Sequence, residues 1–405
     1  MASRNRILYQ SEALYVGDNS TATGPAAADV ASQLNRVQDI SHDLDITRTD
    51  IFEFGRLAPL TRQIIEAPTV SLDFSYLLAD GDNEDNMGLE IAKAADAATW
   101  DAGNFQNAIS GILDDDSKKE KNYYVVTTKE HHDADAAGGT APTATDCTVV
   151  GFGNGVISNY VINAAVGDLP TASVSIEAYN CRFADGVAGT AGNWISGISP
   201  RVNKETSQLK NDYFQLPAAS SGTLEVFSLR PGDVTVSFSD GGSEANKLQI
   251  GGAILPTGDG DPDSASTADG DTPVHIQNFS IEMPLARTPL NRIGSAFPYD
   301  RAVDFPLDMT FNMSSFLADV SEGQLIDLMC NDQETRDITV DCKFPCGDNR
   351  AGETTDMKFV IKNAYLQSQN FGATIGDNKT VDLSFTAQLG GVNDTGNGLF
   401  ISGQA

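Results

Sequence analysis

The stretch VQDISHDLDITRTDIFEFGRLAPLTRQI, residues 37–64, decides the fold because it occurs twice. It aligns without gaps with IQNFSIEMPLARTPLNRIGSAFPYDRAV, residues 276–303, at an offset of 239 positions (276 against 37). The identical pairs in the two stretches include Gln38/Gln277, Ser41/Ser280, Arg48/Arg287, Thr49/Thr288, Gly55/Gly294 and Arg62/Arg301. A glycine that both copies retain indicates a backbone position where a Cβ would not fit.

The similarity continues beyond this stretch. APTVSLDFSYLLAD (67–80) and FPLDMTFNMSSFLAD (305–319) both alternate apolar and polar residues, which is the pattern of a half-buried strand. Further along, VGDLPTASVSIEA (166–178) aligns with IGDNKTVDLSFTA (375–387), where Gly-Asp indicates a turn into an antiparallel strand. One short strand would match by chance, but two blocks in the same order favour a duplication.

The repeat predicts a mainly β chain with two tandem β-sandwich domains, each with a short flanking helix. We place the first copy at 1–187, a connection at 188–222 and the second copy at 223–405. The offset falls to 209 in the second block (375 against 166), so the first copy carries about thirty extra residues, which we place between 80 and 146. Helices are expected at 86–100 and at 321–330, the second with a capping box.

The charge argues against nucleic-acid binding through phosphate contacts. The 405 residues, enough for two domains, carry a formal net charge of -30. Solubility, adaptation to salt, or a wall that DNA passes without sticking would all account for this charge. The N-terminus lacks a signal-peptide pattern, no stretch has the length of a membrane span, and the five cysteines are sparse. We therefore expect a protein that is made and assembled inside a cell, without membrane contact.

No motif indicates catalysis, a cofactor or a metal. His131 and His132 are adjacent and project differently, and they need ligands from elsewhere. The aspartates of 258–271 have calcium-like spacing, but Pro262 interrupts them. GFGNGV (151–156) is followed by a strand pattern and not by a helix, which argues against a dinucleotide loop. The sequence predicts a protein that is not an enzyme.

The N-terminal MASRNRILYQSEALYVG, the RTDIFEFGRLAPLTRQIIEAPTVSLDFSYLLAD block and the repeat unit as a whole resemble the major tail tube proteins of long-tailed (siphovirus-type) double-stranded DNA bacteriophages. The resemblance implies tube domains that join edge to edge into rings, which stack around a lumen. It implies a virion protein of the tail, assembled in the host cytoplasm, through which DNA passes without specific binding. Its partners would be further copies of itself, as a trimer with pseudo-sixfold symmetry or a hexamer, and terminator and distal tail proteins.

Four arginines that both copies retain are candidates for assembly contacts: Arg48, Arg62, Arg287 and Arg301. Their alternative role is a surface charge or an intradomain salt bridge. Three other functions remain open, one of them an encapsulating or decoration protein. The tube of a contractile tail or injection system usually has single-domain subunits, which the duplication disfavours. A carbohydrate-binding fibre protein would need clustered exposed aromatics, whereas the two tryptophans lie in unrelated contexts.

Overall fold

The two halves of the chain have the same strand arrangement in a computed structural model, which is mainly β as predicted. The structure describes residues 11–18, 29–93, 106–114, 116–128, 134, 147–185, 194–195, 199–204, 206, 208–209, 214–216, 228–239, 249–250, 253–255, 271–320, 335–342, 357–392 and 394–403.

Each half contributes five antiparallel strands to a sheet. In the first half the order is β3 (Ser32–Gln33), β1 (Glu12–Asp18), β9 (Lys121–Thr127), β10 (Thr148–Ala165) and β12 (Asn180–Asp185). In the second half it is β20 (Asp271–Pro273), β17 (Val234–Ser239), β26 (Arg336–Cys342), β27 (Met357–Gly372) and β29 (Gly398–Gly403). The same arrangement of five strands is therefore built twice, and β8 (Ile91–Lys93) of the first half adds to the second of these sheets, parallel to β29.

The two halves also share one continuous antiparallel sheet of eight strands, here called the shared sheet. Its order is β4 (Val37–Asp45), β7 (Thr69–Leu77), β11 (Thr171–Ala178), the second half of β10, β21 (Ile276–Pro284), β24 (Leu307–Phe316), β28 (Thr380–Leu389) and the second half of β27. The long strands β10 and β27 each pass from one sheet into the other. Their registers shift between Ile157 and Asn159 and between Leu366 and Ser368, which are equivalent positions.

The core lies between the sheets. Alternate residues of β7, such as Leu72 and Phe74, are buried and pack in one cluster with Leu14 of β1 and Tyr123 of β9. This burial follows the period-two pattern of the sequence, because successive side chains of a strand point to opposite faces. The same cluster continues into the second half, where Phe238, Phe311 and Phe385 pack together.

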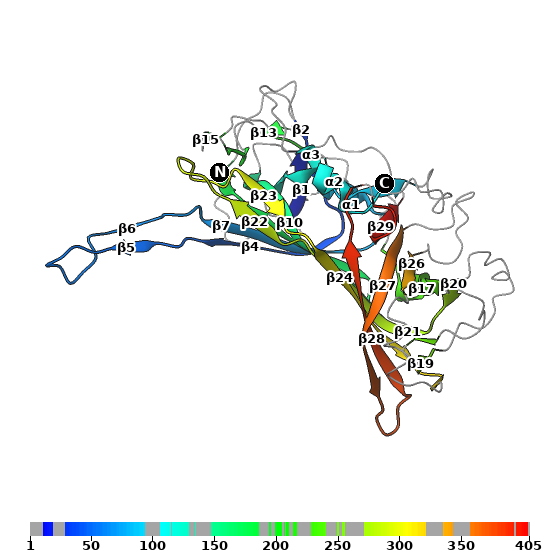
Figure 1. Cartoon of the computed structure of the whole chain (residues 1–405). Helices are drawn as coiled ribbons and strands as arrows, with labels where there is room; N and C mark the ends of the chain where they lie inside the picture. The colour runs from blue at the N-terminus through cyan, green and yellow to red at the C-terminus, as the bar shows by residue number, and fades with distance from the viewer. Residues whose placement is uncertain are drawn as a thin grey trace.

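Each half carries a hairpin after its first strand of the shared sheet. The first arm is β5 (Thr49–Ile51) and β6 (Thr61–Gln63), and the second arm is β22 (Arg287–Leu290) and β23 (Asp300–Val303). The registers are equivalent, since Thr49 pairs with Gln63 and Thr288 with Ala302. A Cβ at Gly55 or Gly294 would meet nothing within 4 Å, so the expected lack of space was wrong. Their φ of 88° and 93° suits glycine and accounts for its retention. The first arm projects far from the body, whereas the second lies against it (Figure 1).

The helices are short: α1 (Asp82–Met87), α2 (Ser110–Asp114) and α3 (Asp116–Lys119), with a 3-10 turn at Pro231–Asp233. The prediction of a helix over 86–100 was wrong for residues 88–93, because α1 ends at Met87 and β8 (Ile91–Lys93) forms a parallel pair with β29. The open edge of that sheet supplies backbone partners, which outweighs the helical propensity of the segment. Residues 94–100 and the helix predicted at 321–330 lie outside the described residues.

Short strands form the remaining sheets: β13 (Trp194–Ile195), β16 (Phe214–Gln215) and β2 (Asp29–Val30); β14 (Val202–Asn203) and β15 (Gln208–Leu209); and β18 (Gln249–Ile250), β19 (Ala253–Ile254) and β25 (Asp319–Val320). Phe214 of the predicted connection stacks on Tyr124, with 3.9 Å between ring centroids, so this part of the connection packs on the first half. Among the described residues, no helix has the length and apolar character that crossing a bilayer requires.

Candidate assembly interface

The junction between the halves is a strand pair inside one chain. β10 pairs with β21 from Asn159 opposite Pro284 to Ala165 opposite Asn278. Ile162 of β10 and Met283 of β21 are fully buried at this seam. The first half thus uses one margin of its part of the shared sheet to bind the second half by backbone hydrogen bonds.

The equivalent margins at the two ends of the shared sheet are open. Among the described strands, β4 pairs only with β7, and the second half of β27 only with β28. Leu44 of β4 is 44% exposed, although its counterpart Met283 is 0% exposed. Phe371 of β27 is 43% exposed, although its counterpart Ile162 is 0% exposed. The same positions are therefore covered at the junction and bare at the ends.

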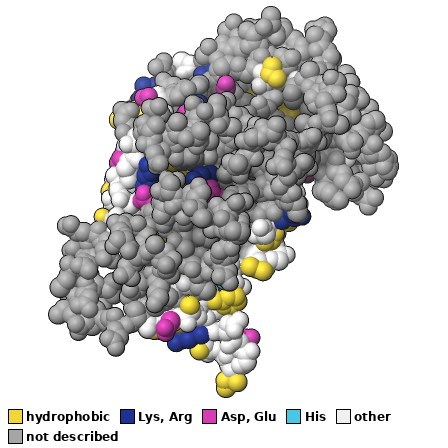
Figure 2. All heavy atoms as spheres, turned by 90° about the vertical axis from the view of Figure 1, so that its right-hand side faces the viewer, with side chains coloured by type: hydrophobic (Ala, Val, Ile, Leu, Met, Phe, Trp, Pro, Cys, Tyr) yellow, Lys and Arg dark blue, Asp and Glu magenta, His cyan; other side chains and the backbone are white. Residues whose placement is uncertain are grey.

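Hydrophobic side chains are visible at one of these open ends. The lower tip of the molecule in Figure 2, where Figure 1 places the hairpin between β27 and β28, carries yellow side chains. Ile375, in the turn of this hairpin, is fully exposed. An open strand with apolar neighbours is a site where another strand can add.

The second arm is seated on the first half through its two retained arginines. Arg301, 9% exposed, donates to the carbonyl of Glu177 at 3.1 Å, and its guanidinium lies 4.2 Å from the centre of the Tyr179 ring. The carboxylate of Glu177 lies 3.6 Å from the same guanidinium. Arg287 donates through Nε to the carbonyl of Ile157 at 3.4 Å. Burial lowers the pKa of Arg287, and the nearby Glu120 carboxylate opposes this shift.

Other side chains of the second arm complete this seat. Asp300 accepts from Lys119 at 2.8 Å, and the ring of Phe297 meets Tyr179 edge-on at 6.0 Å between centroids. Ser295 donates to the carbonyl of Lys204 at 3.1 Å. The seat thus combines charged, aromatic and backbone contacts between the halves.

The first arm has no such seat within the described part of its own chain. Arg48 is exposed, and the side chain of Arg62 is 64% exposed and pairs with Asp50, on the same arm, at 2.7 Å. The exposed large hydrophobic residues of this arm and its base are Ile46, Phe52, Phe54, Leu57, Leu60, Ile64 and Ile65. The structure thus brings Arg287 and Arg301 to the junction and leaves Arg48 and Arg62 in solvent.

One face of the shared sheet is polar, and its own strands contribute no positive charge to it. Its strand segments contain no lysine or arginine. The acidic residues lie on the face opposite the core by strand register: Asp39, Asp43, Asp45, Asp73, Glu177, Glu282, Asp308 and Asp382. Between them lie serine, threonine and asparagine side chains.

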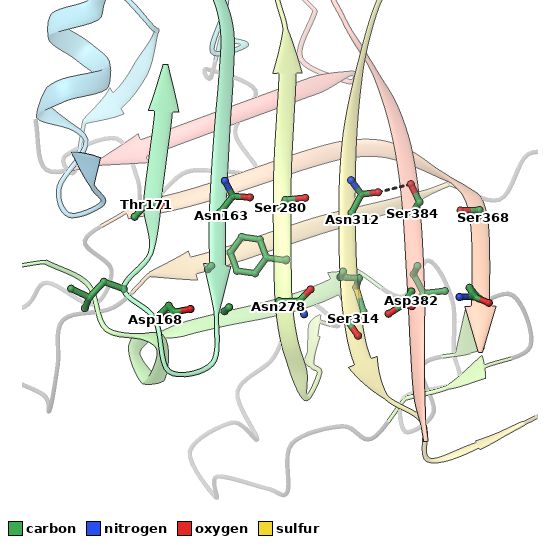
Figure 3. A pocket seen from close by; sticks show the side chains of 17 residues that line it. Asn163, Asp168, Thr171, Asn278, Ser280, Asn312, Ser314, Ser368, Asp382 and Ser384 are labelled. Carbon is green, nitrogen blue, oxygen red and sulfur yellow. Dashed lines mark hydrogen bonds between the residues drawn. The ribbon is translucent and has the colours of Figure 1, made fainter. Parts of the chain in front are cut away.

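This polar face is concave where the halves meet. An open hollow of about 790 Å³ lies over β10, β21, β24, β28 and β27. A row of polar side chains crosses it from strand to strand, through Thr171, Asn163, Ser280, Asn312, Ser384 and Ser368 (Figure 3). Ser384 donates to Asn312 Oδ1 at 2.6 Å. The row runs without a break across the junction.

The sequence did not identify Tyr179, Glu177 or Ile157 as the seat of the second arm, because they lie more than a hundred residues from Arg301 and Arg287. The polar face had a usable signal, namely alternating strands without lysine or arginine. His131, His132 and residues 258–270 lie outside the described residues, and no cluster of three metal-ligating side chains occurs among the residues that the structure describes. Residues 151–156 lie inside β10, as the argument against a dinucleotide loop requires.

No family model matches the chain, and no curated protein matches it. Among solved structures, it is similar to a chain in the cryo-EM structure of the anti-feeding prophage baseplate, at 11% identity and a TM-score of 0.23. The match covers 45% of this chain and 98% of that one. A likeness at this TM-score does not assign a function.

Proposed function

We propose that the chain is a structural protein of the virion, the tail tube protein of a long-tailed double-stranded DNA bacteriophage, and not an enzyme. Copies would join into rings, and the rings would stack into a tube that conducts DNA during ejection. The sequence resemblance named above leads to this proposal.

The observation that carries the proposal is the continuous, concave, polar face of the shared sheet, whose described strands contribute no lysine or arginine. A wall of carboxylates, hydroxyls and amides offers no positive charge to the phosphates of DNA. Within about 10 Å, the Debye length at 0.1 M salt, its acidic residues repel the DNA backbone. A face of this kind suits DNA that must slide past it.

The open margins of the shared sheet support ring formation. A bare strand edge is a hazard in a monomer, because it pairs with other chains. Head-to-tail contacts remove the hazard when they close into a ring, since every edge then has a partner. With two tube domains in each chain, we favour three chains per ring with pseudo-sixfold symmetry, with a hexamer as the alternative.

Negative-stain microscopy of the purified full chain tests this proposal. Rings or tubes with an open lumen are the expected result, together with no retention of duplex DNA at 0.1 M salt. A chain that stays monomeric at all concentrations, or one that binds oligosaccharides as a monomer, would overturn the proposal and favour a fibre protein.

A further inference from the structure

We infer that the junction inside the chain is repeated between chains, so that β4 of one copy pairs with the second half of β27 of the next copy in a defined register. This inference rests on the proposed function and adds the residues in contact. The partner is a second copy of this chain.

The register follows from the two offsets that the structure preserves. β21 is equivalent to β4 at an offset of 239, and both strands have a register shift at the same place, Ile276/Asn278 and Val37/Asp39. β10 is equivalent to β27 at an offset of 209, again with matching register shifts. Moving the β10–β21 pairs by these offsets places Asp45 opposite Ser368 and Asp39 opposite Thr374 of the neighbour.

The lengths of the two strands agree with an absent partner. β10 extends to Ala165, where it is paired with Asn278 of β21. The equivalent end of β27 would be Thr374, but β27 ends at Gly372. A strand loses its last residues where one side lacks hydrogen-bonding partners. Addition of β4 from a neighbour would extend β27 by these two residues.

The same transfer places the first arm. Arg287 and Arg301 bind the carbonyls of Ile157 and Glu177, so Arg48 and Arg62 would meet the carbonyls of Leu366 and Thr386 of the neighbour. The surroundings of Arg62 would differ from those of Arg301, because Thr386 stands at the position equivalent to Glu177 and has no carboxylate. The first arm instead exposes Phe52 and Leu57 where the second arm has Asn291 and Ala296. Burial of apolar surface would therefore hold this arm.

Three cysteine pairs in the full chain test the register. Directly opposite residues of an antiparallel pair have Cα atoms about 4.5–5.5 Å apart, within the range of a disulfide. The pair Asp43→Cys with Asn370→Cys is opposite in the inferred register. The pair Asp43→Cys with Ser368→Cys is displaced by two residues on the same face. The pair Val161→Cys with Glu282→Cys is the intrachain equivalent and the positive control.

After mild oxidation, electrophoresis without reductant should show covalent multimers for Asp43→Cys with Asn370→Cys. Their yield should exceed that of the displaced pair by about tenfold, since diagonal neighbours are about 7–8 Å apart. Chains with one introduced cysteine correct for the native cysteines, of which Cys147 and Cys342 are buried. The intrachain pair should give a linked monomer.

The outcomes separate the two proposals. Rings or tubes without preferential linking of Asp43→Cys with Asn370→Cys would overturn the inferred register and leave the proposed function standing. A chain that forms no assemblies would overturn both. Multimers specific to this pair, in a preparation that shows rings, would support both.

Discussion

The clearest prediction compares two arginines at equivalent positions of the two arms. Arg301→Ala should destabilise the isolated chain by about 2–5 kcal/mol, and Arg62→Ala by less than about 1 kcal/mol. Arg301 loses a charged hydrogen bond, of about 1.5–3 kcal/mol, and a cation–π contact of about 0.5–2 kcal/mol. Arg62 loses only an exposed pair with Asp50, of about 0–1 kcal/mol.

Guanidinium chloride unfolding at low protein concentration measures both changes, because dilution keeps the chain monomeric. Arg301→Lys is the control that retains the charge but not the planar group over Tyr179, so it should fall between wild type and Arg301→Ala. Arg62→Ala should weaken ring formation without affecting the stability of the monomer. Equal destabilisation by Arg301→Ala and Arg62→Ala would refute the reasoning, because the seat of the second arm would then contribute nothing.

Three further predictions concern the margin, the polar face and a buried carboxyl. Leu44→Lys should change monomer stability by less than about 0.5 kcal/mol and abolish ring formation, whereas Met283→Lys should destabilise the monomer by several kcal/mol. Denaturation measures the stability of each variant, and light scattering measures its assembly. Ring formation by Leu44→Lys would contradict the interface. Asn312→Lys, on the hollow, should confer DNA binding that weakens as salt rises, measurable by fluorescence anisotropy; salt-independent binding would contradict it. Burial raises the pKa of Glu84, whose Oε1 accepts a hydrogen bond from Tyr76 at 2.6 Å. The folded chain therefore holds the Glu84 proton more tightly than the unfolded chain does. Wild-type stability should fall as pH rises from the pKa of Glu84 in the unfolded chain to its pKa in the folded chain. Glu84→Gln keeps the oxygen acceptor and does not ionise, so it should become more stable relative to wild type as pH rises through this range. The gain should be about 1.4 kcal/mol for each unit by which the folded pKa of Glu84 exceeds the unfolded pKa. A difference in unfolding free energy that does not change with pH would refute this.

The strands with the strongest alternation were predictable from the sequence. The repeat identified β4 as equivalent to β21 and β7 as equivalent to β24. Their orientation was also predictable, because a strand with apolar residues at every second position has one way to face a core. The retained glycines, Gly55 and Gly294, marked the turns of both arms for a local reason, their positive φ.

The features that depend on distant pairing were not predictable. Nothing in residues 91–93 indicates that they add to β29, more than 300 positions away. The β10–β21 junction has no local sequence signal either, since any alternating antiparallel strand can pair with another. The retained arginines were found by alignment, but their environments became distinct only when the fold placed one arm on Tyr179 and left the other in solvent. The boundaries at 187 and 223 remain predictions.

The β10–β21 pairing has a consequence for the kinetics of assembly. Covalent connection makes this pairing unimolecular, so it forms at any protein concentration, whereas a contact between separate chains obeys mass action. In a ring built from such chains, every second contact is already complete when the chain has folded. Fewer encounters are then needed to reach a closed nucleus, and the two kinds of contact are free to diverge in sequence, as the residues facing the two arms have already done.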